Sequence, residues 1–78
     1  MKYYIMYLPS NYFLSNYDKY AAYWGWTSSS EFAYISNSLE EAKEALDQVR
    51  RYHERLKGRV SEEIIIISED ELIIREMI

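Results

Sequence analysis

The chain has 78 residues, a net charge of −4 and no cysteine, and it contains one histidine, His53. Its length suits one domain spanning 1–78. The lack of cysteine excludes disulfides, thiolate metal sites and cysteine nucleophiles, and a lone imidazole offers little for metal binding or catalysis. We therefore expect neither an enzyme nor a bound metal or cofactor.

The charge and hydropathy patterns bear on partners and location. An excess of acidic residues argues against direct binding of DNA or RNA, because that affinity rests mainly on Lys and Arg. The longest apolar run, Tyr3 to Leu8, is far below the ~20 residues that cross a bilayer, and the N-terminus lacks the pattern of a secretory signal. We expect a cytoplasmic protein with no membrane contact.

Three segments of the N-terminal half predict β-strands. Residues 1–8 cluster Tyr, Ile and Met before Pro9 and are apolar on both faces, which is typical of a central strand. Residues 11–15 predict a short strand that pairs back through the Pro9 turn. After a loop at 28–30, residues 31–36 predict a further strand.

The aromatic segment between these strands supports two interpretations. Asn16 as a capping residue, Asp18 in the first turn and Gly25 at the stop position predict a short helix over 17–24. An aromatic strand over 20–26 is the alternative. Periodicity over nine residues does not separate the two.

The best-marked element is a helix over 38–57. Ser38 and Glu41 form a capping box at its start, and Gly58 supplies a left-handed stop. Apolar or amphipathic residues recur at spacings of three and four, which predicts one buried stripe. The stripe consists of Leu39, Ala42, Leu46, Val49, His53 and Leu56. In this position we interpret His53 as a packed side chain rather than a ligand or base.

The C-terminal part predicts a hairpin. The run Ile64–Ile67 is β-branched and suits a strand that is buried on both faces. Residues 68–71 predict a polar turn, and residues 72–78 a return strand, which we favour over one bent strand. The chain is then an α+β domain, with an antiparallel sheet of three to five strands and the 38–57 helix across one face.

The second face of this sheet also needs cover. One helix covers one side, whereas the strands at 1–8 and 64–67 are apolar on both. Either the short helix at 17–24 folds under the sheet, or the apolar surface remains open beyond what monomers usually expose. We expect a homodimer that joins through this face or through an edge strand.

The aromatic residues are the strongest candidates for a binding site. All of them except Tyr52 lie between Tyr3 and Tyr34. They form either core or an exposed patch, and Tyr and Trp are typical of interface hot spots. Trp24 and Trp26 lead as exposed anchors because they flank a glycine in a predicted connection. The candidate protein-binding residues are Tyr17, Tyr20, Tyr23, Trp24 and Trp26.

One stretch carries a resemblance to a known class. It runs Ala33-Tyr34-Ile35-Ser36-Asn37-Ser38-Leu39-Glu40-Glu41-Ala42, continues to Ala45-Leu46 and follows Trp26-Thr27. It resembles the strand-then-helix middle of small phage and prophage accessory proteins. The resemblance implies a compact, non-enzymatic protein, and some members of the class, such as anti-CRISPR proteins, inhibit host defence by binding it.

On this basis we expect a phage-type inhibitor that occludes the surface of a host protein complex in the host cytoplasm. The alternative is a small-ligand binder, such as a sponge for a nucleotide signal, with Tyr and Trp rings stacked on a base. An aromatic-lined pocket favours the sponge, and a flat or convex aromatic patch favours the inhibitor.

Overall fold

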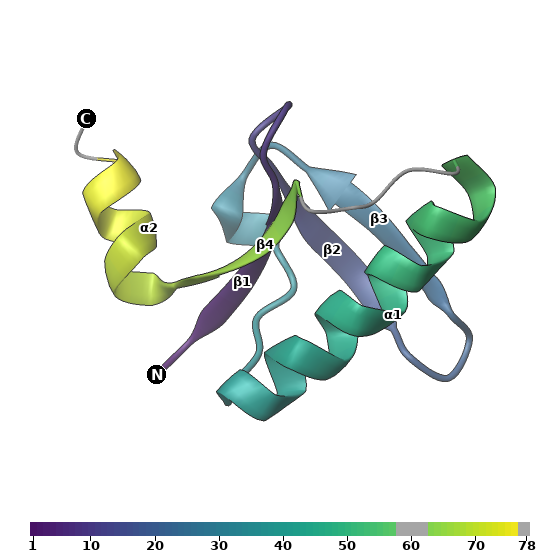
Figure 1. Ribbon diagram of the computed structural model, residues 1–78. Coiled ribbons are helices and arrows are strands. Elements are labelled where there is room, and N and C mark those ends of the chain that lie inside the picture. Colours follow the sequence, from purple (N-terminus) through teal and green to yellow (C-terminus); the bar gives the residue numbers. More distant parts are fainter. Residues whose placement is uncertain (58–62, 77–78) are drawn as a thin grey trace.

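Four antiparallel strands form a sheet that lies between two helices (Figure 1). The computed structural model describes residues 1–57 and 63–76. The strand order is β3-β2-β1-β4. The elements are β1 Tyr3–Tyr7, β2 Tyr12–Asp18, β3 Tyr23–Thr27, a 3-10 helix η1 Ser30–Phe32, α1 Leu39–Lys57, β4 Ile64–Ser68 and α2 Glu69–Glu76. The predicted α+β class, with a long helix across one sheet face, is confirmed.

The β1–β2 hairpin closes around a short turn. The Asn11 N–H donates to the Leu8 carbonyl at 3.3 Å, and Asn11 adopts a left-handed φ of 57°. Asn tolerates this conformation better than most side chains. Both predicted strands are present, and the second continues to Asp18.

The predicted helix over 17–24 is wrong. The chain stays extended in β2, turns, and returns as β3, so the alternative of an aromatic strand is closer but begins at Tyr23. Asp18 explains the difference, because its Oδ1 accepts from the N–H groups of Tyr20 at 3.0 Å and Ala21 at 3.2 Å. A side chain that binds the next N–H groups stabilises a turn as readily as a helix start.

The predicted strand over 31–36 is reduced to a single bridge. Ser29 accepts from the Glu31 N–H at 3.3 Å and starts η1 instead. Farther on, Ser36 exchanges two 2.9 Å backbone hydrogen bonds with Tyr3. The Tyr34 N–H donates to the Leu14 carbonyl at 2.7 Å. This segment therefore bonds to both β1 and β2, which pair with each other only near their turn.

Helix α1 starts as its capping box predicts. The Glu41 N–H donates to Ser38 Oγ at 3.2 Å, and Glu41 Oε2 accepts from the Asn37 N–H at 3.3 Å. On α1, Ala42, Ala45 and Val49 are buried, whereas Leu39 of the predicted stripe is 43 % exposed. The predicted stop at Gly58 and the side chain of Leu56 lie outside the described residues.

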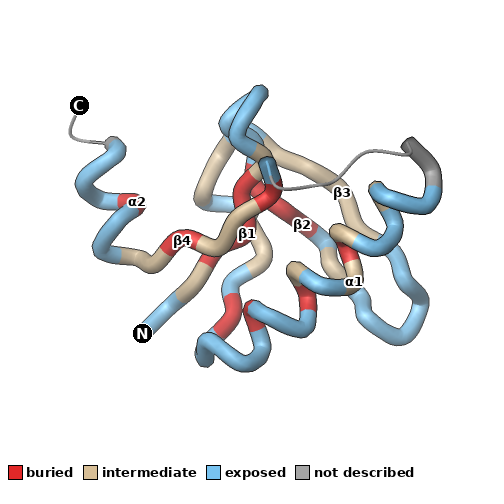
Figure 2. Tube along the Cα trace, viewed as in Figure 1, coloured by how far each residue is buried: buried red, intermediate tan, exposed pale blue. Residues whose placement is uncertain are grey.

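Figure 2 shows buried residues in β1, β2, β4, α1 and α2. They form two clusters on opposite sides of the sheet, because successive residues of β1 point to opposite faces. The cluster facing α1 comprises Ile5, Leu14, Ala45, Val49 and Ile64. The cluster on the other face comprises Tyr4, Met6, Phe13, Ile67 and Leu72. Both faces of β1 and β4 thus hold buried side chains, as predicted.

The predicted return strand at the C-terminus is wrong, because residues 69–76 form α2. Ser68 Oγ accepts from the Glu71 N–H at 3.2 Å, and three acidic residues occupy the first turn. This is the N-terminal signal that also starts α1. Residues 77–78 of the predicted strand lie outside the described part.

Helix α2 covers part of the second sheet face. Leu72 is only 6 % exposed, and Ala33 packs against the same cluster. The chain therefore supplies cover that the sequence pattern had assigned to a second copy or to the aromatic segment. The homodimer stays a prediction. Neither α1 nor α2, over the residues described, is long and apolar enough to cross a membrane.

Replacing Leu72 tests whether the burial of its side chain holds α2 against the sheet. Leu72→Ala should lower the free energy of unfolding by about 2 kcal/mol, because it opens a cavity beneath the helix. The matched variant Ile74→Ala removes an aliphatic side chain that is 59 % exposed and should cost under about 0.5 kcal/mol. Urea denaturation of both variants measures the difference, and equal small effects would contradict the docking.

Candidate functional site

An aromatic cluster fills the space between the β2–β3 hairpin and α1. The Trp24 and Tyr52 rings meet edge to face at a centroid distance of 5.0 Å, and those of Trp26 and His53 at 6.1 Å. Because Trp24 and Trp26 are two residues apart in one strand, they share the sheet face that α1 covers. The predicted packing of His53 is confirmed, since its ring also contacts Tyr7 at 6.4 Å.

Gln48 of α1 joins the hairpin to the helix. The Tyr17 hydroxyl donates to Gln48 Oε1, and Gln48 Nε2 donates to the Lys19 carbonyl at 3.3 Å. Tyr17 also packs edge to face on Tyr34 at 5.0 Å. These bonds hold the end of β2 and the start of the turn against α1.

Burial raises the pKa of Tyr17 above its ordinary value of 10.0, with further contributions from Tyr34, Glu44 and Asp18. Each of these causes disfavours the phenolate. The Tyr17 hydroxyl therefore stays protonated to a higher pH than that of a free tyrosine.

The structure separates the five predicted binding residues into two groups. Tyr17, Trp24 and Trp26 are half-buried and pack against the core cluster beneath α1. Tyr20 and Tyr23 are 89 % and 62 % exposed. The hairpin tip, residues 18–23, is thus where the predicted aromatic surface remains open to solvent.

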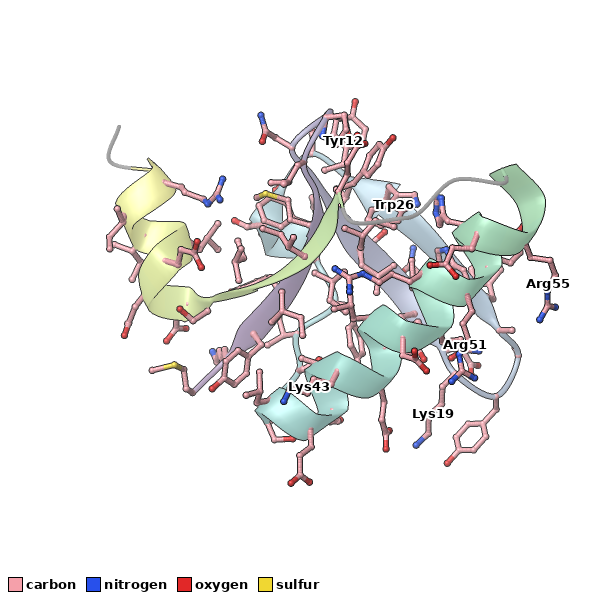
Figure 3. The ribbon with its side chains drawn as sticks, in the orientation of Figure 1. Tyr12, Lys19, Trp26, Lys43, Arg51 and Arg55 are labelled. Atoms are coloured by element: carbon pink, nitrogen blue, oxygen red, sulfur yellow. The ribbon has the colours of Figure 1, made fainter. Side chains whose placement is uncertain are left out.

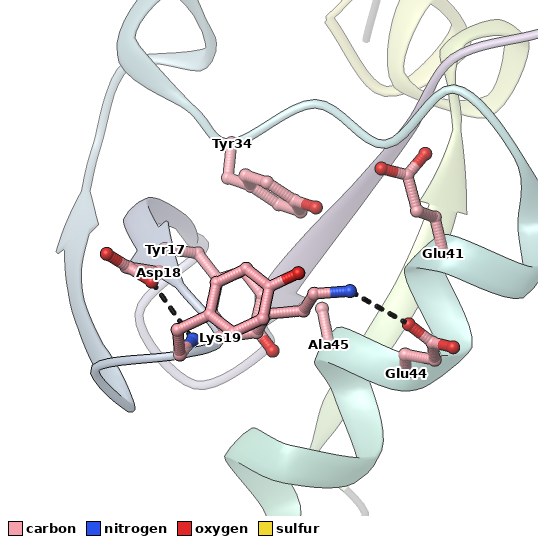
Figure 4. A pocket seen from close by; sticks show the side chains of 8 residues that line it. Tyr17, Asp18, Lys19, Tyr34, Glu41, Glu44 and Ala45 are labelled. Atoms are coloured by element: carbon pink, nitrogen blue, oxygen red, sulfur yellow. Dashed lines mark hydrogen bonds and ion pairs between the residues drawn. The ribbon is translucent and has the colours of Figure 1, made fainter.

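A first hollow, the tyrosine hollow, lies between the hairpin tip and the first half of α1 (Figure 4). Its volume is about 280 Å³. It is lined by Tyr17, Asp18, Lys19, Tyr20, Tyr34, Glu41, Glu44 and Ala45. Lys19 Nζ lies 4.0 Å from Glu44 Oε2 and 5.2 Å from the centre of the Tyr20 ring.

A second hollow, the tryptophan hollow, lies beside the second half of α1 and measures about 440 Å³. It is lined by Ala22, Trp24, Asp47, Gln48, Arg51, Tyr52 and Arg55. Arg51 pairs with Asp47 at 2.9 Å, and Arg55 forms no ion pair among the described residues. Figure 3 shows Lys19, Arg51 and Arg55 on one side of the molecule.

Sequence reasoning missed the α1 contribution to both hollows. The lining residues of α1 recur at helical spacing in a second stripe that overlaps the buried face at Ala45, and this was the available signal. They are Glu41, Glu44, Ala45, Gln48, Arg51, Tyr52 and Arg55. Without the position of the hairpin, such a stripe is indistinguishable from an ordinary solvated helix face.

Within residues 1–57 and 63–76, no three His, Asp or Glu side chains are grouped so as to hold a metal ion. Comparison with protein-family models, with curated proteins and with solved structures found no match to the chain. Function must therefore be argued from the hairpin tip and the two hollows.

The Tyr17 hydroxyl offers a test of the cluster. Tyr17→Phe should lower the free energy of unfolding by about 1 kcal/mol at neutral pH, since the hydrogen bond to Gln48 is lost. The wild-type advantage should be complete below the unfolded pKa of 10.0 and shrink above it, because the unfolded chain then ionises first. Urea denaturation at neutral and alkaline pH measures both effects. Stability curves that stay parallel across this range would contradict the raised pKa.

Proposed function

We propose that this chain is a non-enzymatic protein-binding module whose contact is centred on the hairpin tip. The observation that supports it is the exposure of Tyr20 and Tyr23, two large side chains that contribute little to the core. Tyr offers a wide contact area, few rotatable bonds and one polar end, which suits it to interface hot spots.

The conformation of the tip supports the same proposal. Asp18 accepts two backbone hydrogen bonds within the turn, and Gln48 of α1 binds the Lys19 carbonyl. A turn that is already ordered loses less conformational entropy when a partner binds it. Tyr20 and Tyr23 are therefore presented by a shaped surface rather than by a loose loop.

The narrower form of the proposal is an inhibitor of the phage accessory type. This form of the proposal rests on the sequence resemblance at residues 33–46, of which the structure retains α1 and reduces the strand to a single bridge at Ser36. A protein of this kind acts by occluding a surface of a host protein complex in the host cytoplasm, and occlusion requires no reaction from the chain itself.

The hairpin tip can be tested by a double substitution. A partner captured from a bacterial lysate by the wild-type chain is purified and titrated against the Tyr20→Ala, Tyr23→Ala variant. We expect the Kd to rise about 30-fold, which corresponds to about 2 kcal/mol, with the circular dichroism melting curve retained. The control Ile73→Ala, Ile74→Ala removes exposed apolar side chains from α2 and should leave the Kd unchanged. Equal losses in both double variants would contradict the proposal.

A second candidate function, binding of an aromatic anion such as a nucleotide, is favoured by the tryptophan hollow. Trp24 and Tyr52 offer rings, and Arg55 offers a guanidinium with no ion pair among the described residues. Stacking on a base and pairing with a phosphate are the two interactions that such a ligand needs. This candidate is the small-ligand alternative of the sequence analysis, a sponge for a nucleotide signal.

Titration with AMP tests this candidate. AMP should shift the Trp24 indole N–H resonance at millimolar concentration, whereas adenosine or inorganic phosphate alone should shift it much less. Arg55→Gln should weaken AMP binding about fivefold, in the range of one exposed charge pair, and Arg75→Gln on α2 should not. An unmoved Trp24 resonance would exclude the nucleotide function.

A further inference from the structure

We propose that the tyrosine hollow binds a Lys or Arg side chain from a basic segment of the protein partner. The inference rests on the proposed protein-binding function and names the chemistry of the partner. It follows from the charge that lines the hollow, from the position of Lys19 and from the aromatic walls.

The lining of the hollow is acidic from both sides. Asp18 lies on the hairpin wall, where its Oδ1 accepts from the turn, and Glu41 and Glu44 lie on α1 opposite it (Figure 4). One oxygen of Glu41 accepts from the Asn37 N–H, and Glu44 pairs with Lys19. Against these three carboxylates stands a single cation, Lys19. The local charge therefore attracts a second cation, and the attraction is stronger in a partly enclosed hollow than in bulk water.

Lys19 already shows which chemistry the hollow accepts. Its ammonium group lies 4.0 Å from Glu44 Oε2 and 5.2 Å over the Tyr20 ring. The Lys19 and Glu44 side chains remain 52 % and 68 % exposed, so the ion pair is weak and readily exchanged. A partner cation can take the place of Lys19 at little cost.

The walls suit an organic cation better than a metal ion. Tyr17 and Tyr34 meet edge to face at 5.0 Å, and Gln48 holds the Tyr17 hydroxyl, so two rings are fixed beside the carboxylates. An ammonium or guanidinium group gains from both a ring face and a carboxylate. By contrast, no described group of three acidic or His side chains is arranged to hold a metal.

The hollow also adjoins the proposed contact. Tyr20 belongs to both its wall and the exposed hairpin tip. A partner that covers the tip therefore brings its own side chains to the opening. Among common side chains, Arg fits best because its planar guanidinium can pair with a carboxylate in bidentate fashion and stack on a ring.

Fluorescence anisotropy with a labelled hexa-arginine peptide tests the acidic wall. Glu41→Gln with Glu44→Gln should raise the Kd about fivefold, because the peptide loses two carboxylates with which its guanidinium groups can pair. Gln at position 41 can still cap the helix. The matched control, Glu69→Gln with Asp70→Asn, changes the same net charge in the first turn of α2 and should change the Kd less than about twofold. No measurable binding, or equal losses in the two variants, would overturn the inference.

Two lysine variants test the displacement. Lys19→Met removes the cation inside the hollow and should tighten hexa-arginine binding about threefold. Lys43→Met removes the same charge from α1 outside the lining and should have a smaller effect. Equal effects would show that only net charge matters and would overturn the assignment to this hollow.

Failure of this inference is distinguishable from failure of the proposed function. The peptide assay uses no native partner, and the Tyr20→Ala, Tyr23→Ala variant changes no charged side chain. If native binding is lost in that double variant but unchanged by Glu41→Gln with Glu44→Gln, the protein-binding function stands and the basic-segment inference falls.

Discussion

The need to cover both faces of one small sheet is the constraint on which the rest of the molecule depends. β1 and β4 bury apolar side chains on both sides, and a single helix covers only one side. Helix α1 covers one face, and Leu72 of α2 together with Ala33 covers the other. Because the C-terminal residues supply that second cover, the aromatic segment is not needed beneath the sheet and can form a hairpin instead.

This arrangement of the two helices leaves the hairpin tip exposed, where we propose that a partner binds. With the hairpin folded against α1, Tyr17, Trp24 and Trp26 pack against the core, and Tyr20 and Tyr23 project at the tip. The two hollows differ in the charge of their lining, because α1 is acidic at Glu41 and Glu44 and basic at Arg51 and Arg55. Acids near the start of a helix and cations near its end also complement its dipole, so stability and surface chemistry agree.

Local signals predicted the elements that depend on local chemistry. The capping box at Ser38 placed α1, and the apolar run before Pro9 placed β1. The same kind of cap was present at Ser68 and Glu71, but the β-branched residues that follow favoured a strand. The segment forms a helix rather than a strand because the helix places Leu72 in the second cluster. That cluster is assembled by residues from distant parts of the chain.

From composition alone, Tyr17, Tyr20, Tyr23, Trp24 and Trp26 could be named as candidate binding residues, and sites built on cysteine or on several histidines could be excluded. Which of these rings are open to solvent depends on how the chain packs. Strand parity turns Trp24 and Trp26 toward α1, while the Asp18 turn leaves Tyr20 in solvent. The hollows were equally beyond sequence reasoning, since each needs a helix stripe and a hairpin that come together only when α1 packs across the sheet.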